Sequence, residues 1–188
     1  EIVLDCDIRS VDGSYLVRTS RGDFGAPALV VATGGLSIPK IGATDLGYRI
    51  AAHFGVPIVP TRPALVPMVF GPADAARWTP LAGVAADCVA SAGGAAFRER
   101  LLFTHRGLSG PAILQVSSYM RSGDAVHIDL LPDVDIAAEL ALRRAAGDTA
   151  QPKSVVGRYL PARLADAWFA DDTDRPLAAT SNERIAAI

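Results

Sequence analysis

The alternation of apolar and polar residues predicts that strands dominate the first part of the chain. Residues 2–9 alternate, and residues 15–20 alternate again after a Val-Asp-Gly turn, so both are expected to be half-buried strands of a hairpin. Residues 28–32 (ALVVA) contain no polar position at all. Such a run is typical of a parallel-type strand that is buried on both faces.

A helix and two short strands are expected next. Asp45 is a suitable N-cap for a helix over residues 46–54, and Gly55 can end this helix. Residues 58–59 and 64–70 have the apolar character of strands. Because several prolines lie in and around them, these strands are expected at the edge of a sheet.

A second hairpin is the clearest strand signal in the chain. Residues 84–90 alternate, Gly93 and Gly94 supply a turn, and residues 96–103 run back. Further elements expected around this hairpin are a short helix at residues 72–78, a helix at residues 111–121 and a strand at residues 125–131.

The last third of the chain changes to a helical pattern. Asp135 is expected to cap a helix that Gly147 ends, and Thr180 with Glu183 has the spacing of a capping box for a later helix. Between them, we expect helices at residues 155–160 and 162–169 and a solvated acidic loop at residues 171–174.

The composition is that of an ordinary globular protein. Of the 188 residues, 50% are hydrophobic and 20% are charged, and 18 basic against 20 acidic residues give a net charge of −2. Because no basic stripe interleaved with aromatic residues is present, nucleic acid is not expected as a partner. The longest uncharged run, residues 24–39, is too short and too rich in glycine to span a membrane, so no membrane is expected either.

Cysteine usage and the two ends of the chain add two expectations. Cys6 and Cys88 lie far apart on alternating positions, which favours packing roles over a disulfide scaffold, a metal site or a nucleophile. Two such cysteines fit a reducing cytoplasm. The chain starts inside a strand-like pattern and stops inside a helix-like one, so it is expected to be part of a longer protein.

Residues 28–42 are one candidate binding segment. The predicted strand runs directly into Gly34 and Gly35, and open α/β sheets bind ligands at the carboxyl ends of their strands. Glycines at this place let the backbone approach a cofactor closely. A glycine turn without any ligand accounts for the same pattern, so both interpretations stay open.

Residues 101–115, LLFTHRGLSGPAILQ, are the other candidate. Arg106 is suited to hold an anion and His105 to move a proton, beside a helix N-terminus that favours negative charge. The structural alternative is that Ser109 caps the helix and Pro111 occupies its first turn. Gly-Leu-Ser-Gly also begins like a nucleophile elbow, but Pro111 stands where the second glycine of that motif belongs.

Three stretches in this order resemble a family of bacterial FAD flavoproteins: ALVVATGGLSIPKIGATDLGYRIAAHFG, RPALVPMVF and LLFTHRGLSGPAILQVSSY. The family consists of NAD(P)/FAD-dependent oxidoreductases of the aminoacetone-oxidase-like or bile-acid-dehydratase-like type. The resemblance covers nearly the whole chain and thins after residue 131. In such proteins the FAD domain is split, and a substrate-side domain is inserted into it.

The resemblance implies a place for FAD in the full-length protein. The residues that it places near the cofactor are Thr33, Gly34, Gly35, Ser37, Pro39 and Gly42. His105 and Arg106 become the candidate catalytic residues on the substrate side. Because the sequence contains no G-x-G-x-x-G motif for the pyrophosphate, the chain alone is expected to bind FAD weakly or not at all and to be inactive.

These observations predict an α+β protein. It consists of a fragment of a Rossmann-like FAD domain (a strand hairpin plus a parallel-type strand), an inserted β-rich domain and a small helical part, with boundaries at residues 1–60, 61–133 and 134–188. The predicted function is the central part of a FAD-dependent oxidoreductase, with the remainder of the FAD domain and an unidentified small-molecule substrate as partners. A non-catalytic binding module and a serine hydrolase built on Ser109 are the alternatives.

Overall fold

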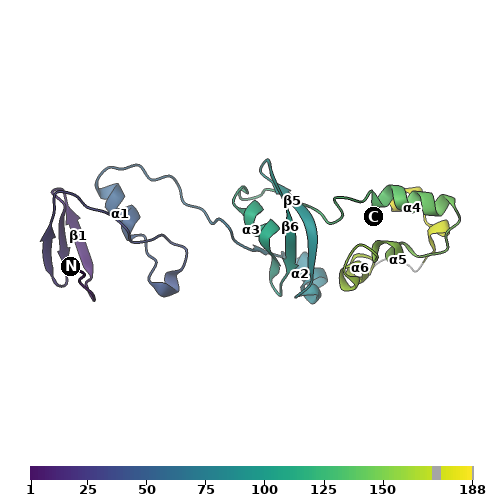
Figure 1. The fold of residues 1–188 in the computed structure, drawn as a ribbon, viewed down its shortest axis with the longest axis horizontal. Helices are drawn as coiled ribbons and strands as arrows, with labels where there is room; N and C mark the ends of the chain where they lie inside the picture. Colours follow the sequence, from purple (N-terminus) through teal and green to yellow (C-terminus); the bar gives the residue numbers. More distant parts are fainter. Residues whose placement is uncertain (171–174, 188) are drawn as a thin grey trace. The chain divides into compact units, whose positions relative to one another are not determined.

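The computed structural model describes residues 1–170 and 175–187, so the acidic loop expected at residues 171–174 lies outside the described residues. The chain divides into two compact units, Glu1–Arg62 and Pro63–Ile188. All strand pairs in the described ranges are antiparallel, and helices accompany them in both units, which confirms the α+β class (Figure 1). The division into three domains stays a prediction. None of the described helices is long and apolar enough to cross a membrane.

The first unit contains a small three-stranded meander. The strands of the meander are β1 (Ile8–Asp12), β2 (Leu16–Thr19) and β3 (Gly22–Gly25). The unit also contains the 3-10 helix η1 (Pro39–Ile41) and the helix α1 (Leu46–His53). β2 lies between β1 and β3 and is antiparallel to both, so the predicted hairpin is confirmed. Its first strand begins at Ile8 rather than at residue 2. Ile2 stays 86% exposed, because no element of this unit covers the apolar face of that segment.

The parallel-type strand predicted at residues 28–32 does not form. None of these residues pairs with a strand of the described chain, and Val30 is 86% exposed. A wholly apolar run becomes a buried strand only where neighbouring strands and covering helices bury both of its faces. The described residues supply no pairing strand, although Gly47 of α1 lies close to Val31. The Rossmann-like interpretation of this segment is therefore not confirmed.

Helix α1 agrees with the prediction except at its cap. Asp45 makes no capping hydrogen bond; its carboxylate lies 3.0 Å from the Arg49 guanidinium one turn further on. The Leu46 N–H donates instead to Thr44 Oγ1 at 3.3 Å. Gly55 follows the helix with a φ of +72°, the left-handed conformation that commonly ends a helix.

The second unit contains a five-stranded antiparallel sheet. Its strands are β4 (Met68–Val69), β5 (Ala85–Ala92), β6 (Ala95–Phe103), β7 (Gly107–Ser109) and β8 (His127–Asp129), in the spatial order β4-β7-β6-β5-β8. β5 and β6 form the predicted hairpin, with Ala85 opposite Leu102 at its open end. The strands expected at residues 58–59 and 64–70 are reduced to β4, because the prolines there remove N–H groups from the ladder.

One face of the β5–β6 hairpin is covered by helix α3 (Pro111–Ser117) (Figure 1). Cys88 and Ala90 on β5 and Ile113 and Val116 on α3 have no exposed surface. Burial raises the pKa of the Cys88 thiol, as expected for a packing residue. The helix ends one turn before its predicted end, yet the predicted core face is the one that packs on the sheet.

The second unit is helical after β8. Its later elements are α4 (Ile136–Ala145), α5 (Pro152–Val156), α6 (Ala162–Trp168), η3 (Leu177–Ala179) and α7 (Asn182–Ala186), while α2 (Pro72–Trp78) and η2 (Thr79–Leu81) precede the β5–β6 hairpin. Asp135 caps α4 as predicted, because its Oδ1 accepts from the Ala138 N–H at 2.9 Å. The cap of α7 is Ser181 rather than Thr180. Ser181 Oγ reaches the Arg184 N–H, whereas the Thr180 hydroxyl donates to a backbone carbonyl one turn earlier.

Two tryptophans connect the sheet with the helical part. The ring centroid of Trp78 lies 6.2 Å from that of Phe103 and 5.8 Å from that of Trp168. The Arg77 guanidinium lies over the Trp78 ring and also donates to the Trp168 carbonyl at 2.9 Å. Leu140 of α4 is buried in the same apolar cluster as the sheet residues. The sheet and the helices of the second unit therefore share one core.

Candidate functional site

The loop that joins β6 to β7 is a tight turn built around one threonine. Thr104 Oγ1 accepts hydrogen bonds from the N–H groups of Arg106 and Gly107, at 3.2 and 3.1 Å. The same hydroxyl donates to the Gly107 carbonyl at 3.0 Å, and the Thr104 N–H donates to that carbonyl at 2.8 Å. A single side chain thus replaces the hydrogen bonds that a longer turn would need from its backbone.

His105 and Arg106 form the exposed tip of this turn. The Arg106 carbonyl accepts from the Phe70 N–H at 3.0 Å, just after β4. Glycine is required at position 107, because a Cβ on Gly107 would lie 1.9 Å from the Met68 carbonyl oxygen. The turn therefore presents an imidazole and a guanidinium to solvent from a fixed backbone, and these groups are suited to proton transfer and to anion binding.

Ser109 has neither of the roles that the sequence suggested. It is the last residue of β7 and lies opposite Leu102 of β6, so it does not cap α3. The N-cap is Gly110, with a φ of +91°, and a Cβ there would lie 2.7 Å from the Arg100 carbonyl oxygen. A nucleophile elbow requires the serine itself at a strained strand-to-helix turn, whereas here the turn falls on the glycine.

The predicted cofactor-binding residues lie close together in the first unit. Gly34 and Gly42 have φ values of +72° and +93°, and nothing lies within 4 Å of the place where a Cβ would be. A Cβ on Gly35 would lie 3.7 Å from the Tyr48 hydroxyl of α1. Ser37 follows in an exposed loop, and Pro39 is the first residue of η1. The segment is an exposed loop whose glycines leave its backbone open to close approach.

Thr33, which precedes these glycines, has a buried hydroxyl without a hydrogen-bond partner among the described residues. Gly47 of α1 lies against it: a Cβ on Gly47 would be 2.8 Å from Thr33 Oγ1. A buried hydroxyl that makes no hydrogen bond costs about 1–3 kcal/mol. The position is therefore one where a polar group of a ligand, or of another chain segment, would be stabilised.

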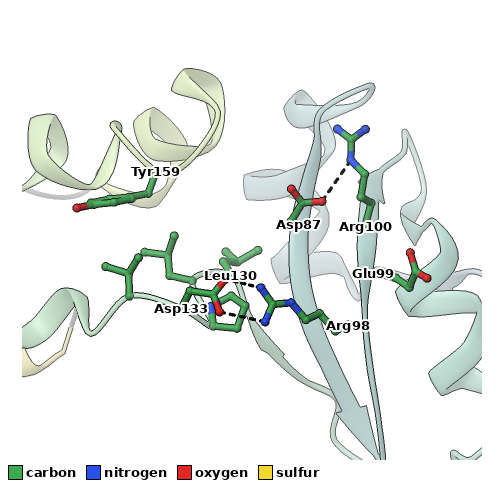
Figure 2. Close-up of a pocket in the computed structure, with 10 residues that line it drawn as sticks. Asp87, Arg98, Glu99, Arg100, Leu130, Asp133 and Tyr159 are labelled. Atoms are coloured by element: carbon green, nitrogen blue, oxygen red, sulfur yellow. Dashed lines mark hydrogen bonds and ion pairs between the residues drawn. The ribbon is translucent and has the colours of Figure 1, made fainter.

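A groove that the sequence did not indicate lies beside the outer face of the β5–β6 hairpin. It has a volume of about 360 Å³, and its lining includes Asp87, Arg98, Glu99, Arg100, residues 130–134 and Tyr159. Figure 2 shows Tyr159 on the helical side and the two arginines on the strand side, with Leu130 and Asp133 between them. Because segments distant in the sequence form this groove, no local sequence motif predicts it.

The two arginines of the groove differ in how they are paired. Arg98 donates to both carboxylate oxygens of Asp133, which raises the pKa of Arg98 and lowers that of Asp133. Arg100 lies 3.6 Å from Asp87, and its side chain is 65% exposed. Arg98 is therefore held by its partner, whereas the Arg100 guanidinium keeps donors free for an incoming group.

The Tyr159 ring is anchored from the side away from the strands. Its hydroxyl donates to Glu139 at 2.6 Å, and Arg143 holds Glu139 at 2.8 Å and Asp148 at 3.2 Å. The hydrogen bonds from Tyr159 and Arg143 lower the pKa of Glu139, and the Glu139 carboxylate raises the pKa of Tyr159. Tyr159 is nevertheless 44% exposed. The groove therefore has one wall made of an oriented, accessible aromatic ring.

Residues 62–188 match the family described as HI0933-like protein barrel and H2TH domain. The chain belongs to this family. It is similar to the ribosomal RNA dihydrouridine synthase of Escherichia coli (strain K12), with 48% identity over 143 residues, and to that of Haemophilus influenzae, with 39% identity over 156 residues. The matches cover 76% and 82% of this chain but 36% and 39% of the relatives. The chain thus spans little more than a third of their length.

These comparisons overturn the family assignment made from the sequence. The family is described as HI0933-like protein barrel and H2TH domain, and both relatives are named ribosomal RNA dihydrouridine synthases. The prediction of a central part of a FAD-dependent oxidoreductase, of the aminoacetone-oxidase-like or bile-acid-dehydratase-like type, was therefore wrong. The alternatives, a non-catalytic binding module and a serine hydrolase built on Ser109, were wrong as well.

The exclusion of nucleic acid was also wrong, as was the expected small-molecule substrate, because both relatives are named for action on ribosomal RNA. The exclusion rested on a net charge of −2 and on the lack of a basic stripe in the linear sequence. Neither quantity reports how side chains are arranged in space. Arg98 and Arg100, two positions apart on one strand, share a face with each other and a groove with an aromatic ring from another segment.

Proposed function

We propose that this chain is part of a ribosomal RNA dihydrouridine synthase and that its second unit faces the RNA. The observation that carries the proposal is the 48% identity over 143 residues with the Escherichia coli enzyme. In this proposal residues 1–60 belong to the cofactor domain, and residues 61–133 and 134–188 form the β-rich and helical parts of an inserted domain on the RNA side.

The reaction reduces the C5–C6 double bond of a uracil base. The C4 carbonyl withdraws electrons through this bond, so C6 accepts a hydride and C5 then takes up a proton. The reaction therefore needs a two-electron donor and an acid near C5. A bound flavin supplies the hydride in such chemistry, and we retain FAD as the cofactor of the full-length protein.

Residues 33–42 fit one edge of such a cofactor. The Thr33 hydroxyl lacks a partner, and the backbone at Gly34 and Gly42 is open. Thr33, Gly34, Gly35, Ser37, Pro39 and Gly42 are the residues that would contact it. Because the sequence lacks G-x-G-x-x-G, the pyrophosphate must be bound elsewhere in the full-length protein, and the chain alone should bind FAD weakly or not at all. Flavin absorbance and titration of this chain test that expectation without any activity assay.

We assign His105 and Arg106 to the RNA side. Both are exposed on a turn whose backbone is fixed by Thr104 and by Phe70. His105 would deliver the proton that C5 takes up, and Arg106 would hold a phosphate of the RNA. Because a fixed backbone limits the number of conformations, placing these side chains against RNA has a small entropic cost.

Deletion of the gene tests the reaction itself. Ribosomal RNA from the deletion strain, digested to nucleosides and analysed by mass spectrometry, is expected to lose dihydrouridine, and the intact gene should restore it. An unchanged dihydrouridine content would contradict the proposed function.

Point variants of the full-length enzyme test the two residue roles. His105→Ala should lower kcat by about 100-fold, the usual contribution of a general acid. Arg106→Ala should instead weaken RNA binding and reduce the slope of log K against log salt by about one. Arg121→Ala, which removes an exposed arginine from another loop, is the matched control and should leave both quantities unchanged. Equal behaviour of the Arg106 and Arg121 variants would remove Arg106 from the interface.

A further inference from the structure

We propose that the groove between β6 and the helical part binds a nucleobase of the RNA, with Tyr159 as its stacking surface. This inference rests on the proposed function and assigns a position of RNA contact separate from the His105–Arg106 turn. The groove volume of about 360 Å³ is sufficient for one nucleotide, and its wall carries the half-exposed ring of Tyr159.

The anchoring of Tyr159 is the first reason. A solvent-exposed tyrosine normally rotates, but here the hydroxyl is held by Glu139, which Arg143 holds in turn, and Arg143 is also bound to Asp148. These charged groups orient the Tyr159 ring without burying it, since Tyr159 stays 44% exposed. An oriented aromatic face is what base stacking requires, and stacking tolerates any base because every base has a π-face.

The charge balance of the groove is the second reason, because it selects a base over a phosphate. Arg98 and Arg100 are opposed by their partners Asp133 and Asp87, so the lining has no excess of positive charge. Such a lining does not attract a phosphate backbone. It offers donors from Arg100 and acceptors from carboxylates, which match the edge of a nucleobase that carries both kinds of group.

The pairing of Arg98 with Asp133 is the third reason. This ion pair joins β6 to the segment that leads from β8 to α4, and so connects the strand wall of the groove to its floor. The donors of Arg98 are occupied by Asp133, whereas the guanidinium of Arg100 contacts Asp87 only at 3.6 Å. Arg100 is therefore the groove residue with donors available for the edge of a stacked base.

A matched pair of substitutions in the full-length protein tests the stacking role. Tyr159→Phe and Tyr159→Leu both remove the hydroxyl and its bond to Glu139, but only the second removes the aromatic face. Binding of a fluorescent oligouridylate is expected to weaken by about threefold for Tyr159→Phe, whose ring keeps its face but loses its anchor. It is expected to weaken by about 10-fold for Tyr159→Leu. The salt dependence should be the same for all three proteins, since no phosphate contact is lost. Equal binding by the two variants would overturn the proposal.

Two further measurements separate this inference from the function on which it rests. Cross-linking of an oligonucleotide that contains 5-bromouracil should label the peptide that carries Tyr159 in the wild-type protein, and labelling confined to other peptides would overturn the groove assignment. In the deletion strain, Tyr159→Leu should restore dihydrouridine less completely than Tyr119→Leu, a control at another exposed tyrosine of the second unit. Full restoration by Tyr159→Leu would reject the groove alone, whereas a deletion strain with normal dihydrouridine would reject both proposals.

Discussion

The two units differ in whether an apolar sequence pattern leads to buried side chains. In the second unit a plain alternation along β5 leaves Cys88 and Ala90 without exposed surface, because α3 packs on that face. In the first unit the more apolar run at residues 28–32 leaves Val30 86% exposed. The comparison shows that hydrophobicity measures the tendency to be buried, while a second covering element decides whether burial happens.

Core truncation should give the largest contrast between the units. Ile113→Ala removes a side chain with no exposed surface and is expected to cost about 2–5 kcal/mol of unfolding free energy. Val30→Ala removes a side chain that is 86% exposed and should change the unfolding free energy by about 0.5 kcal/mol or less. Urea unfolding followed by circular dichroism measures both. Similar losses would show that Val30 is packed in solution and that the two units do not differ in this way.

The same contrast explains how much of the fold was predictable. The β5–β6 hairpin, helices α1, α2 and α4 and the Asp135 cap follow from local patterns, and each makes its defining contacts within a short stretch of chain. The strand expected at residues 28–32 depended on neighbours that a local pattern does not report. Ser109 was misjudged for a related reason, since its pairing with Leu102 of β6 decides its role.

Glycine substitutions should give a smaller difference in stability loss between the two units. A Cβ at Gly107 would lie 1.9 Å from a β4 carbonyl, so Gly107→Ala must displace β4 and is expected to cost about 1–3 kcal/mol. At Gly34 nothing lies within 4 Å and only the φ of +72° opposes a side chain, so Gly34→Ala should cost about 1 kcal/mol. Thermal unfolding of both variants provides the measurement. A larger loss at Gly34 would reverse the comparison and would indicate close packing around that loop.

The charge network behind Tyr159 should give the smallest effect, visible mainly through its pH dependence. The folded-state pKa values of Glu139 and Asp148 are lowered, so their contribution is present above the ordinary values of 4.5 and 3.8 and is lost as pH falls through the lowered values. Glu139→Gln should therefore flatten the acid side of the stability curve, whereas Glu99→Gln on β6 serves as the control. A curve left unchanged by Glu139→Gln would show that the network does not persist in solution.

The alkaline side has the opposite sign. The pKa of Tyr159 is raised above its ordinary value of 10.0 by Glu139, so its contribution is present below that pH and is lost as pH rises through the raised pKa. Ultraviolet titration of the phenolate measures this directly. Tyr159 in Glu139→Gln should ionise at lower pH than in the wild type, and an identical titration would contradict the hydrogen bond.

Like the fold, the candidate site has one part that the sequence predicts and one part that it does not. The His105–Arg106 turn was visible in the sequence, because its residues and the threonine that holds them are contiguous. The groove was not visible, because Arg100, Asp133 and Tyr159 belong to three separate segments and none has a motif around it. Sites of the second kind become recognisable only when the packing of helices against strands is known.

The Thr104 hydroxyl fixes the backbone of the β6–β7 turn independently of the side chains at its tip. Every bond that shapes the turn uses Thr104 or backbone groups, and none of them uses the side chains of His105 or Arg106. Those two positions are therefore free to exchange one reactive group for another while the loop keeps its path. Under the proposed roles of His105 and Arg106, replacing either side chain would change the chemistry of the turn without refolding it, provided that Thr104 is kept.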